Sequence, residues 1–377
     1  MYELLQGKNA MMQVTAAITH SKGEISIETV ELVAPKTSEV LVRVLASGVC
    51  HTDSAGINQI IPVTLPAVFG HEGVGVVEEV GAGVESLKHG DRVIMSYPSC
   101  GVCEYCIEGH PYACNHLNKL FFGGSFKDGT KRFSQNGIPV SSFFGQGSFA
   151  THVVVDSRNA VKVDINSDED LMKLCSFGCG VQTGAGTVLN RIHPKPYSSL
   201  VVFGCGGVGM AAIMAAKIVG CTKIIGVDIV SRRLEIAMEV GATHTVNSKK
   251  VDAVEEIKRI TNGGANYSIE SSGSPMVTIQ ALKCLKREGH CVINSVTGNA
   301  EIPIALEPLL MNPSVTLTGL TEGASNPQTF IPKLVQYFNE GRLPVDKLIK
   351  IYDFKDIKQA IEDSLTGITI KPILKFR

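Results

Sequence analysis

The chain has 377 residues, of which 44% are hydrophobic and 19% charged, and its formal net charge at pH 7 is −1. Because single cores stop growing at about 250–300 residues, this length predicts two domains, and the composition excludes a disordered chain. The absence of any run of like charge argues against a nucleic-acid-binding surface. The segment 1–19 has no basic stretch leading into an apolar core, and the longest uncharged stretch, 200–216, is shorter than the roughly 20 residues that span a bilayer. We therefore expect a cytoplasmic protein without a membrane segment.

The first third of the chain consists of short alternating apolar runs, such as 40–46, that glycine and proline interrupt. This pattern predicts a mostly antiparallel β domain. Three possible metal ligands lie in separated motifs: Cys50 in GVCHTD, His71 in GHEGVGVVEEVG and Cys179 in FGCGVQTGAG. Two thiolates and an imidazole leave a fourth coordination position open, which is typical of catalytic zinc. Spacing alone does not decide this grouping, because a histidine after glycine is also common in hydrogen-bonded loops.

A second set of cysteines is spaced C-x2-C-x2-C-x7-C, and it contains Cys100, Cys103, Cys106 and Cys114. Four thiolates on one short segment can close a tetrahedron around Zn²⁺, which is typical of a structural site. A four-cysteine iron–sulfur cluster is the competing interpretation, and four free thiols in a polar loop are the alternative without metal.

A nucleotide-binding motif follows in the middle of the chain. The apolar run Ser199–Phe203 predicts a buried strand, and the stretch 210–219 predicts a helix. Between them lies a G-x-G-x-x-G motif, formed by Gly204, Gly206, Gly207, Val208 and Gly209. In this context the glycines allow a pyrophosphate to approach the start of the helix. The next apolar run ends on Asp228, whose carboxylate would accept hydrogen bonds from ribose and repel a 2′-phosphate, so NAD is favoured over NADP.

The same alternation continues towards the C-terminus. Helical patterns at 232–240, 253–261, 276–285 and 305–311 precede apolar runs at 243–246, 267–270, 290–294 and 315–319. With the two strands before them, these runs predict a six-stranded, doubly wound parallel sheet. A helix at 332–339 and a last run at 368–376 are expected to rejoin the first domain. The predicted boundaries are 1–181 for the catalytic domain with a zinc lobe at 97–117, 182–323 for the coenzyme domain and 324–377 for the returning segment.

These motifs, in this order and spacing, resemble those of the zinc-containing medium-chain alcohol dehydrogenases over essentially the whole chain. Within that family, the long segment after the cysteine lobe and the terminal GITIKPILKF look most like the bacterial aryl-alcohol (benzyl alcohol) dehydrogenases. The resemblance implies an α/β protein with a Rossmann coenzyme domain and a GroES-like β domain. It also implies hydride transfer from a primary alcohol to NAD⁺, with zinc as the Lewis acid, in a homo-oligomer that is a dimer or tetramer.

The resemblance assigns roles to individual residues. Cys50, His71 and Cys179 would hold a catalytic Zn²⁺, and the four-cysteine lobe would hold a structural Zn²⁺. Glu72 would lie beside the catalytic metal, Asp53 would accept the free ring N–H of His71, and Thr52 would hydrogen-bond the alcohol. The expected cofactor contacts are His51 and Lys371 to the pyrophosphate, Thr183 and Val208 to the nicotinamide, Arg233 near the adenosine ribose, and Val296.

Two features bear on the proton path and the substrate. Many family members have a histidine where this chain has Ala55, so proton release must run through Thr52, ribose hydroxyls and water, or through another base. Seven of the 14 phenylalanines lie at positions 121, 122, 126, 133, 143, 144 and 149. In the family's layout they would form an aromatic wall suited to benzyl or allylic alcohols, or they would pack the lobe or a subunit interface.

Other functions remain open at this stage. A glutathione-dependent formaldehyde dehydrogenase would need cationic groups where this chain is rich in phenylalanine, and a general aliphatic alcohol dehydrogenase would not need the aromatic wall. A redox-inactive relative would have no reason to keep all three ligands of the catalytic metal. An interaction module built around the cysteine lobe would not need the rest of an oxidoreductase chain.

Overall fold

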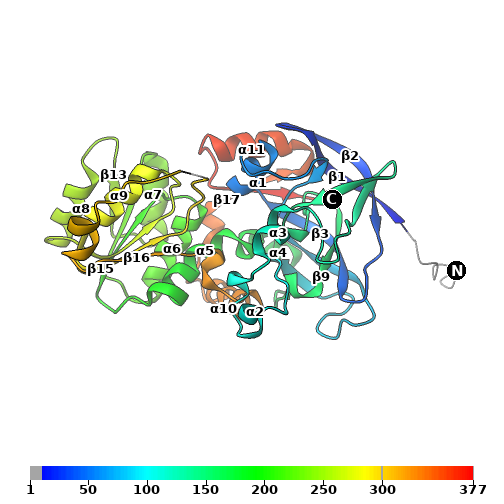
Figure 1. Ribbon diagram of the computed structural model, residues 1–377, viewed down its shortest axis with the longest axis horizontal. Helices are drawn as coiled ribbons and strands as arrows, with labels where there is room; N and C mark the ends of the chain where they lie inside the picture. Colours follow the sequence, from blue (N-terminus) through cyan, green and yellow to red (C-terminus); the bar gives the residue numbers. More distant parts are fainter. Residues whose placement is uncertain (1–10, 299, 377) are drawn as a thin grey trace. The chain divides into compact units, whose positions relative to one another are not determined.

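The computed structural model describes residues 11–298 and 300–376, and the chain forms two compact units (Figure 1). Unit 1 contains the chain up to Cys179, Asn326–Val335 and the chain from Ile349, and unit 2 contains Gly180–Ser325 and Gln336–Leu348. The first division thus lies close to the predicted boundary at 181. The prediction places residues 336–348 in the segment that returns to the catalytic domain, whereas they belong to unit 2. There Leu343 and Val345 are buried, and Arg342 Nη2 donates to the carbonyl of Ile218.

Unit 1 contains a small closed barrel and a seven-stranded sheet. The barrel strands, in order, are β1 (Met11–Ser21), β2 (Glu24–Val33), β7 (Phe133–Gln135), β8 (Ile138–Ser142) and β4 (Ala67–Val68). The sheet strands, in order, are β10 (Ala160–Lys162), β6 (Arg92–Met95), β5 (Glu72–Val80), β3 (Glu39–Gly48), β18 (Lys371–Lys375) and β17 (Ile349–Asp353), and β9 (His152–Asp156) also pairs with β3. Most of these pairs are antiparallel, which confirms the predicted β domain.

The helices of unit 1 are short. They are α1 (His51–Ile57), α2 (Glu104–Ile107), α3 (Leu117–Phe122), α4 (Asp168–Lys173) and α11 (Ile357–Leu365), and α10 (Pro327–Asn339) begins in this unit. The core between them is rich in valine and phenylalanine. The predicted helix begins at Pro332, whereas α10 begins at Pro327, with that proline at its first position, and contains Pro332 in its interior.

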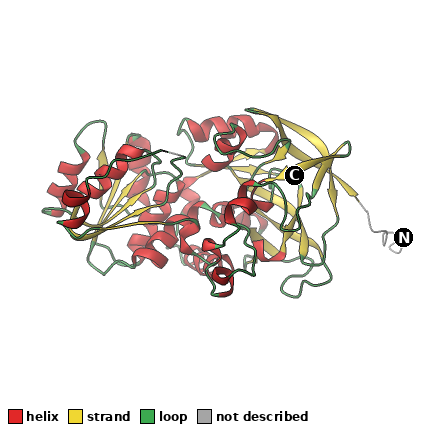
Figure 2. Ribbon diagram, viewed as in Figure 1, coloured by secondary structure: helices red, strands yellow, loops and turns green. Residues whose placement is uncertain are grey.

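Unit 2 contains a six-stranded sheet in which every neighbouring pair is parallel. Its strands, in order, are β13 (His244–Asn247), β12 (Lys223–Asp228), β11 (Ser199–Phe203), β14 (Ala265–Glu270), β15 (Leu285–Ile293) and β16 (Thr316–Gly319). The helices are α5 (Gly180–Gly186), α6 (Gly207–Ile218), α7 (Ser231–Val240), α8 (Ala253–Thr261) and α9 (Pro275–Lys283), and Figure 2 shows helices on both sides of the strands. The predicted doubly wound sheet is therefore confirmed.

The apolar stretch 200–216 forms β11 and most of α6, as predicted. Among the residues that the structure describes, no helix is long and apolar enough to cross a membrane. Helix α6 begins at Gly207, earlier than the predicted residue 210, because the helix starts directly at the glycine-rich turn.

Candidate metal and cofactor sites

The ends of three segments of unit 1 bring together a group of possible metal ligands. Cys50 precedes α1, His71 and Glu72 lie at the start of β5, and Cys179 is the last residue of the unit before α5. One ligand atom of each residue lies within 4.8 Å of the others, and His71 Nε2 is 3.3 Å from Cys179 Sγ. The structure thus brings together the three predicted ligands and Glu72, which the resemblance also placed beside them.

Asp53 holds His71 and the neighbouring backbone in place through three hydrogen bonds. Its Oδ1 accepts hydrogen bonds from His71 Nδ1 at 2.8 Å and from the Gly70 backbone N–H at 3.0 Å, and its Oδ2 accepts the Cys50 N–H at 3.0 Å. Asp53 and His71 are both fully buried, so the ring cannot turn without breaking these bonds. A histidine that donates from Nδ1 presents Nε2 to a metal, which is the usual arrangement of metal-binding histidines.

The charges of the group are strongly coupled. A hydrogen bond from Cys179 lowers the pKa of the Cys50 thiol well below its usual value. Burial alone would lower the pKa of the His71 ring, but Asp53 and Cys50 raise it well above its usual value. Asp53 and Cys50 thus favour the positively charged ring, and a metal cation bound at Nε2 would take the place of a proton there.

The Glu72 carboxylate in this group is paired with Lys371. Lys371 Nζ lies 2.9 Å from Glu72 Oε1 and 2.7 Å from Oε2, and it also donates to the carbonyl of Val49. Burial raises the pKa of the Glu72 carboxyl, while the Lys371 ammonium acts in the opposite direction. Glu72 is therefore a candidate for an additional metal ligand, and its carboxylate is paired with the Lys371 ammonium.

Aromatic rings cover one side of His71. The Phe144 ring stacks on the imidazole with centroids 4.5 Å apart and an interplanar angle of 27°, and the Phe121 ring stacks on Phe144 at 4.1 Å. Phe122 and Phe143 complete this aromatic cluster through contacts with Phe144 at 5.6 and 4.9 Å. Phe144 has a φ of 53°, a conformation that bulky residues seldom adopt and that orients its ring towards His71.

The other three phenylalanines of the 121–149 segment pack elsewhere. Phe133 lies in barrel strand β7, Phe126 packs under the guanidinium of Arg132, and Phe149 lies against Gly70. Of the seven phenylalanines, three therefore pack within the β domain and four lie in the aromatic cluster beside His71.

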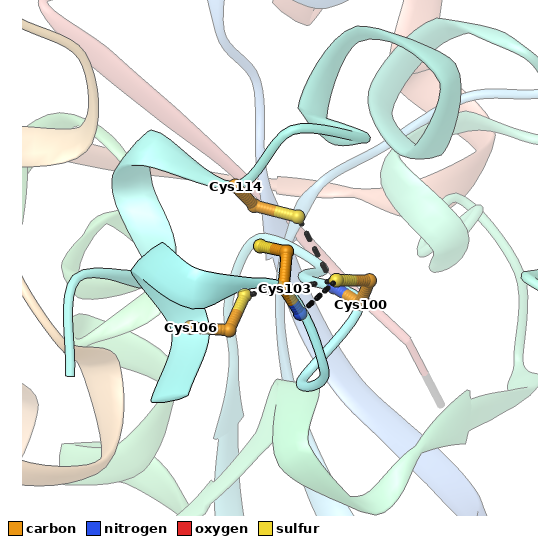
Figure 3. Close-up of side chains that lie close together, drawn as sticks. All are labelled: Cys100, Cys103, Cys106 and Cys114. Atoms are coloured by element: carbon orange, nitrogen blue, oxygen red, sulfur yellow. Dashed lines mark hydrogen bonds between the residues drawn. The ribbon is translucent and has the colours of Figure 1, made fainter. Parts of the chain in front are cut away.

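The four cysteines of the lobe point towards a common centre (Figure 3). Their sulfurs lie within 4.8 Å of one another, and Cys100 Sγ is 3.9 Å from Cys106 Sγ. Backbone N–H groups of Val102 and Cys103 donate to Cys100 Sγ at 3.5 and 3.3 Å, and Cys114 Sγ accepts from Cys100 at 3.3 Å. A backbone hydrogen bond from Asn115 lowers the pKa of the Cys103 thiol to about 6, while burial raises that of Cys106 to about 12.

The glycine-rich turn of unit 2 lies between β11 and α6. Gly204 has a φ of 90°, and a Cβ there would lie 2.8 Å from the Ser272 backbone. A Cβ on Gly209 would lie 1.9 Å from the Gly204 carbonyl oxygen, so the turn closes only with glycine at both positions. The N–H groups at the start of α6 are thus presented to an anion without obstruction by side chains.

Asp228 lies beside this turn at the end of β12. Its Oδ2 accepts the Cys205 N–H and its Oδ1 accepts the Val230 N–H, both at 2.8 Å. Each oxygen keeps a lone pair for a further donor. Arg233 Nη1 lies 3.9 Å from Asp228 Oδ2, and Arg233 Nε is buried without a hydrogen-bond partner among the described residues. This unsatisfied donor fits a site that a polar ligand completes.

The comparisons with known proteins agree with this geometry. Two family models match the chain: the alcohol dehydrogenase GroES-like domain over residues 36–165 and the zinc-binding dehydrogenase over residues 207–339. A geraniol dehydrogenase from Castellaniella defragrans is 41% identical over 96% of this chain and 97% of its own length. The chain belongs to the zinc-binding alcohol dehydrogenase family.

Solved structures of the family have the same fold. An alcohol dehydrogenase zinc-binding domain protein from Burkholderia ambifaria is 44% identical to this chain and has a TM-score of 0.95. The match covers 98% of this chain and all of that one. The benzyl alcohol dehydrogenase of Acinetobacter calcoaceticus is 40% identical, with a TM-score of 0.93 over 97% of this chain and all of its own. The predicted family and fold are confirmed, and the chain is an oxidoreductase of this family.

The remaining predicted site residues of this dehydrogenase fall in both units. Thr52 Oγ1 lies 3.6 Å from Cys50 Sγ in the first turn of α1. Thr183 on α5 and Val208 on α6 lie on closely packed helices, since a Cβ on Gly184 would be 1.9 Å from the Val208 carbonyl oxygen. Val296 is exposed beyond β15. His51 and Lys371 belong to unit 1, and their contact with the pyrophosphate stays a prediction.

Sequence reasoning missed the position of Lys371 beside Glu72. The two residues are 299 positions apart, and they meet because β18 pairs with β3 so that Ile373 lies opposite Gly48. It also missed that four of the seven phenylalanines cluster at His71. A lysine and a phenylalanine-rich loop carry no local signal of such contacts.

Proposed function

We propose that this dehydrogenase transfers a hydride reversibly between NAD⁺ and a primary alcohol whose carbinol carbon is attached to an aromatic ring or a carbon–carbon double bond. The observation that carries the proposal is the aromatic stack of Phe121 and Phe144 on His71, beside the group of metal ligands. A flat, unsaturated substrate placed at the metal would lie beside this aromatic cluster and gain from contact with its apolar side chains. The names of two relatives, a geraniol dehydrogenase and a benzyl alcohol dehydrogenase, support the same substrate class.

The proposed catalytic metal is Zn²⁺ held by Cys50, His71 and Cys179. The donor set of two sulfurs and one imidazole nitrogen fits zinc with an open position, and Asp53 holds the ring with Nε2 towards Cys179. When bound, zinc supplies Lewis-acid polarisation of the alcohol oxygen. Thr52 would hydrogen-bond the alcohol and pass its proton on towards solvent, and the Lys371 ammonium would offset the negative charge of the Glu72 carboxylate beside the ligands.

The proposed structural metal is a second Zn²⁺ in the four-cysteine lobe. With Zn–S bonds of about 2.3 Å, a tetrahedral site has sulfurs about 3.8 Å apart, close to the 3.9 Å between Cys100 and Cys106. A four-iron cluster would hold its cysteine sulfurs farther apart, because each sulfur binds a different iron. The backbone N–H groups that donate to Cys100 and Cys114 are the hydrogen-bond donors that metal-bound cysteine sulfurs accept.

We infer NAD rather than NADP as the cofactor. The buried Asp228 carboxylate lies where the adenosine ribose of a dinucleotide would reach from the glycine-rich turn, and a 2′-phosphate there would meet its negative charge. Arg233, with its unsatisfied Nε, would donate to the same ribose. We also expect a homo-oligomer, since β16 is an edge strand of the parallel sheet and edge strands can pair with a second copy of the chain.

Initial rates with a small panel of alcohols test this function. Benzyl alcohol and geraniol with NAD⁺ should give kcat/KM values up to about tenfold above that of ethanol, since tenfold corresponds to about 1.4 kcal/mol and a buried aromatic pair contributes about 0.5–1.5 kcal/mol. Turnover should fall with NADP⁺ and be lost with a zinc chelator. Preference for ethanol or hydroxymethylglutathione would contradict the aromatic substrate site, and no turnover of any alcohol would support a redox-inactive relative.

A further inference from the structure

Arg158 lies in a short turn, Ser157–Asn159, directly after β9. Its Nε donates to Asp156 Oδ1 at 2.9 Å and its Nη2 donates to Asp156 Oδ2 at 3.0 Å. Lys127 Nζ pairs with the same carboxylate at 3.3 Å. This two-bond contact fixes the plane and direction of the guanidinium group, and it leaves Nη1 pointing away from Asp156.

Nη1 points at the cysteine lobe. A Cβ built on Gly101 would lie 1.4 Å from Arg158 Nη1, so the guanidinium packs directly on the α-carbon side of this glycine. Gly101 also has a φ of 74°, so both this backbone conformation and the close approach of Arg158 favour glycine at this position. It follows Cys100 and begins the loop whose N–H groups, from Val102 and Cys103, donate to Cys100 Sγ. Arg158 is therefore in contact with the loop that presents the first cysteine of the lobe.

The charge of Arg158 is suited to this position. Four thiolates around a divalent zinc ion carry a net negative charge, and a cation close by lowers the free energy of that arrangement. The hydrogen bonds with Asp156 raise the pKa of the Arg158 guanidinium, and the sulfurs of Cys106 and Cys100 act in the same direction. Those two sulfurs are the pair that lies 3.9 Å apart.

We propose that Arg158 is a positioning residue for the metal of the four-cysteine lobe, which holds the Cys100–Cys103 loop in place and offsets the negative charge of the thiolates. The proposal rests on the structural zinc of the proposed function. Arg158 would then determine how firmly the lobe retains its metal, in the way that residues hydrogen-bonded to metal ligands alter affinity about 10–100-fold.

The alternative is that Arg158 forms only a surface ion pair with Asp156. Its side chain has an exposed fraction of 36%, and ion pairs of that kind contribute little to stability. Such a pair predicts no effect of Arg158 on metal retention. The two cases therefore differ in zinc release, and a measurement of activity is not needed to separate them.

The test counts zinc by native mass spectrometry during timed exposure to EDTA. Cys50→Ser and Cys179→Ser are introduced in every protein, so that the counted ion is that of the four-cysteine lobe. Arg158→Gln removes the charge, Arg158→Lys keeps the charge without the fork, and Arg43→Gln is the matched control. Arg43 pairs with Glu78 at 3.0 Å, has a similar exposed fraction of 43% and belongs to the same unit.

We expect Arg158→Gln to lose zinc about tenfold faster than the parent, Arg158→Lys to lie between them, and Arg43→Gln to match the parent. Equal release from Arg158→Gln and the parent would overturn the proposal, as would equally fast release from Arg43→Gln. If Arg158→Gln does not fold, release from Arg158→Lys at the parent's rate is the overturning result. A parent protein that holds no zinc in this background would instead contradict the structural metal of the proposed function.

Discussion

Lys371 Nζ lies 2.7 Å from Glu72 Oε2, and both side chains are buried beside the ligands of the proposed catalytic metal. Removing the lysine would leave a carboxylate without its cation in a site from which water is excluded. A buried charge left in this way typically costs about 3–5 kcal/mol.

We therefore expect Lys371→Met to lower the free energy of unfolding in urea by about that amount. Glu72→Gln added to Lys371→Met should restore most of the loss, because no charge is then left unpaired. Lys375→Met, on the exposed end of the same strand, is the control and should change little. A double variant no more stable than Lys371→Met would show that the ion pair is not the source of the effect.

The second prediction concerns the ligand Cys179. Cys179→Ser weakens the proposed catalytic site without touching the nucleotide turn of unit 2, so kcat/KM should fall by more than about 100-fold. NADH affinity, measured by fluorescence titration, should stay within about threefold of the parent. Cys221→Ser, where Ser198 Oγ offers a hydrogen-bond partner at 3.5 Å, serves as the control. Full activity in Cys179→Ser would rule out this residue as a metal ligand.

The third prediction concerns the cysteine lobe. Cys103→Ser removes one of four sulfurs from a closed site, so the protein should lose this zinc and its Tm should fall by about 5 °C or more. The control is Val102→Ala, since the neighbouring Val102 side chain is 74% exposed. Zinc content and thermal unfolding are measured together. An unchanged Tm with one zinc fewer would mean that the metal does not stabilise the fold.

The fourth prediction tests the aromatic cluster at His71. Phe144→Leu keeps an apolar side chain but removes the ring that stacks on the imidazole. We expect kcat/KM for benzyl alcohol to fall about tenfold and that for ethanol to change much less. Phe126→Leu, whose ring contacts Arg132 instead of His71, should affect both alcohols alike. Equal losses for the two alcohols in Phe144→Leu would remove the argument that the aromatic cluster contacts the substrate.

The fifth prediction is a pH dependence of stability. The hydrogen bond from Tyr352 lowers the pKa of the Asp363 carboxyl to about 2, with further contributions from Gln359 and Lys350. Because the pKa is lower in the folded than in the unfolded chain, Asp363 stabilises the fold above about pH 4, and this contribution is lost as the pH falls towards 2.

Urea unfolding of Asp363→Asn beside the parent checks this dependence. The parent should unfold at higher urea than the variant at pH 6, and the difference should shrink between about pH 4 and pH 2. The same difference at every pH would show that the effect of the substitution does not come from ionisation.

Much of the molecule was predictable from its sequence, because the deciding signals lie within a few residues of one another. The buried run Ser199–Phe203, the glycine-rich turn and the helix after it form one local unit, and the structure has β11 at those bounds. The spacing of the four cysteines in the lobe is also a local signal, because all four lie within one short segment. The parallel direction of the unit 2 strands follows from the alternation of short apolar runs with helical patterns. This prediction needs no knowledge of side-chain contacts.

The tertiary structure alone decided which distant side chains meet. Pairing of β18 with β3 brings Lys371 to Glu72, the left-handed backbone at Phe144 turns its ring onto His71, and the Asp156 carboxylate aims Arg158 at Gly101. Each contact depends on strand register or on a single backbone conformation, and a one-residue slip would remove it. Periodicity and motif spacing in the sequence therefore specify the elements and the four-cysteine ligand set, whereas the charges and rings that surround the ligands are specified only by the packed fold.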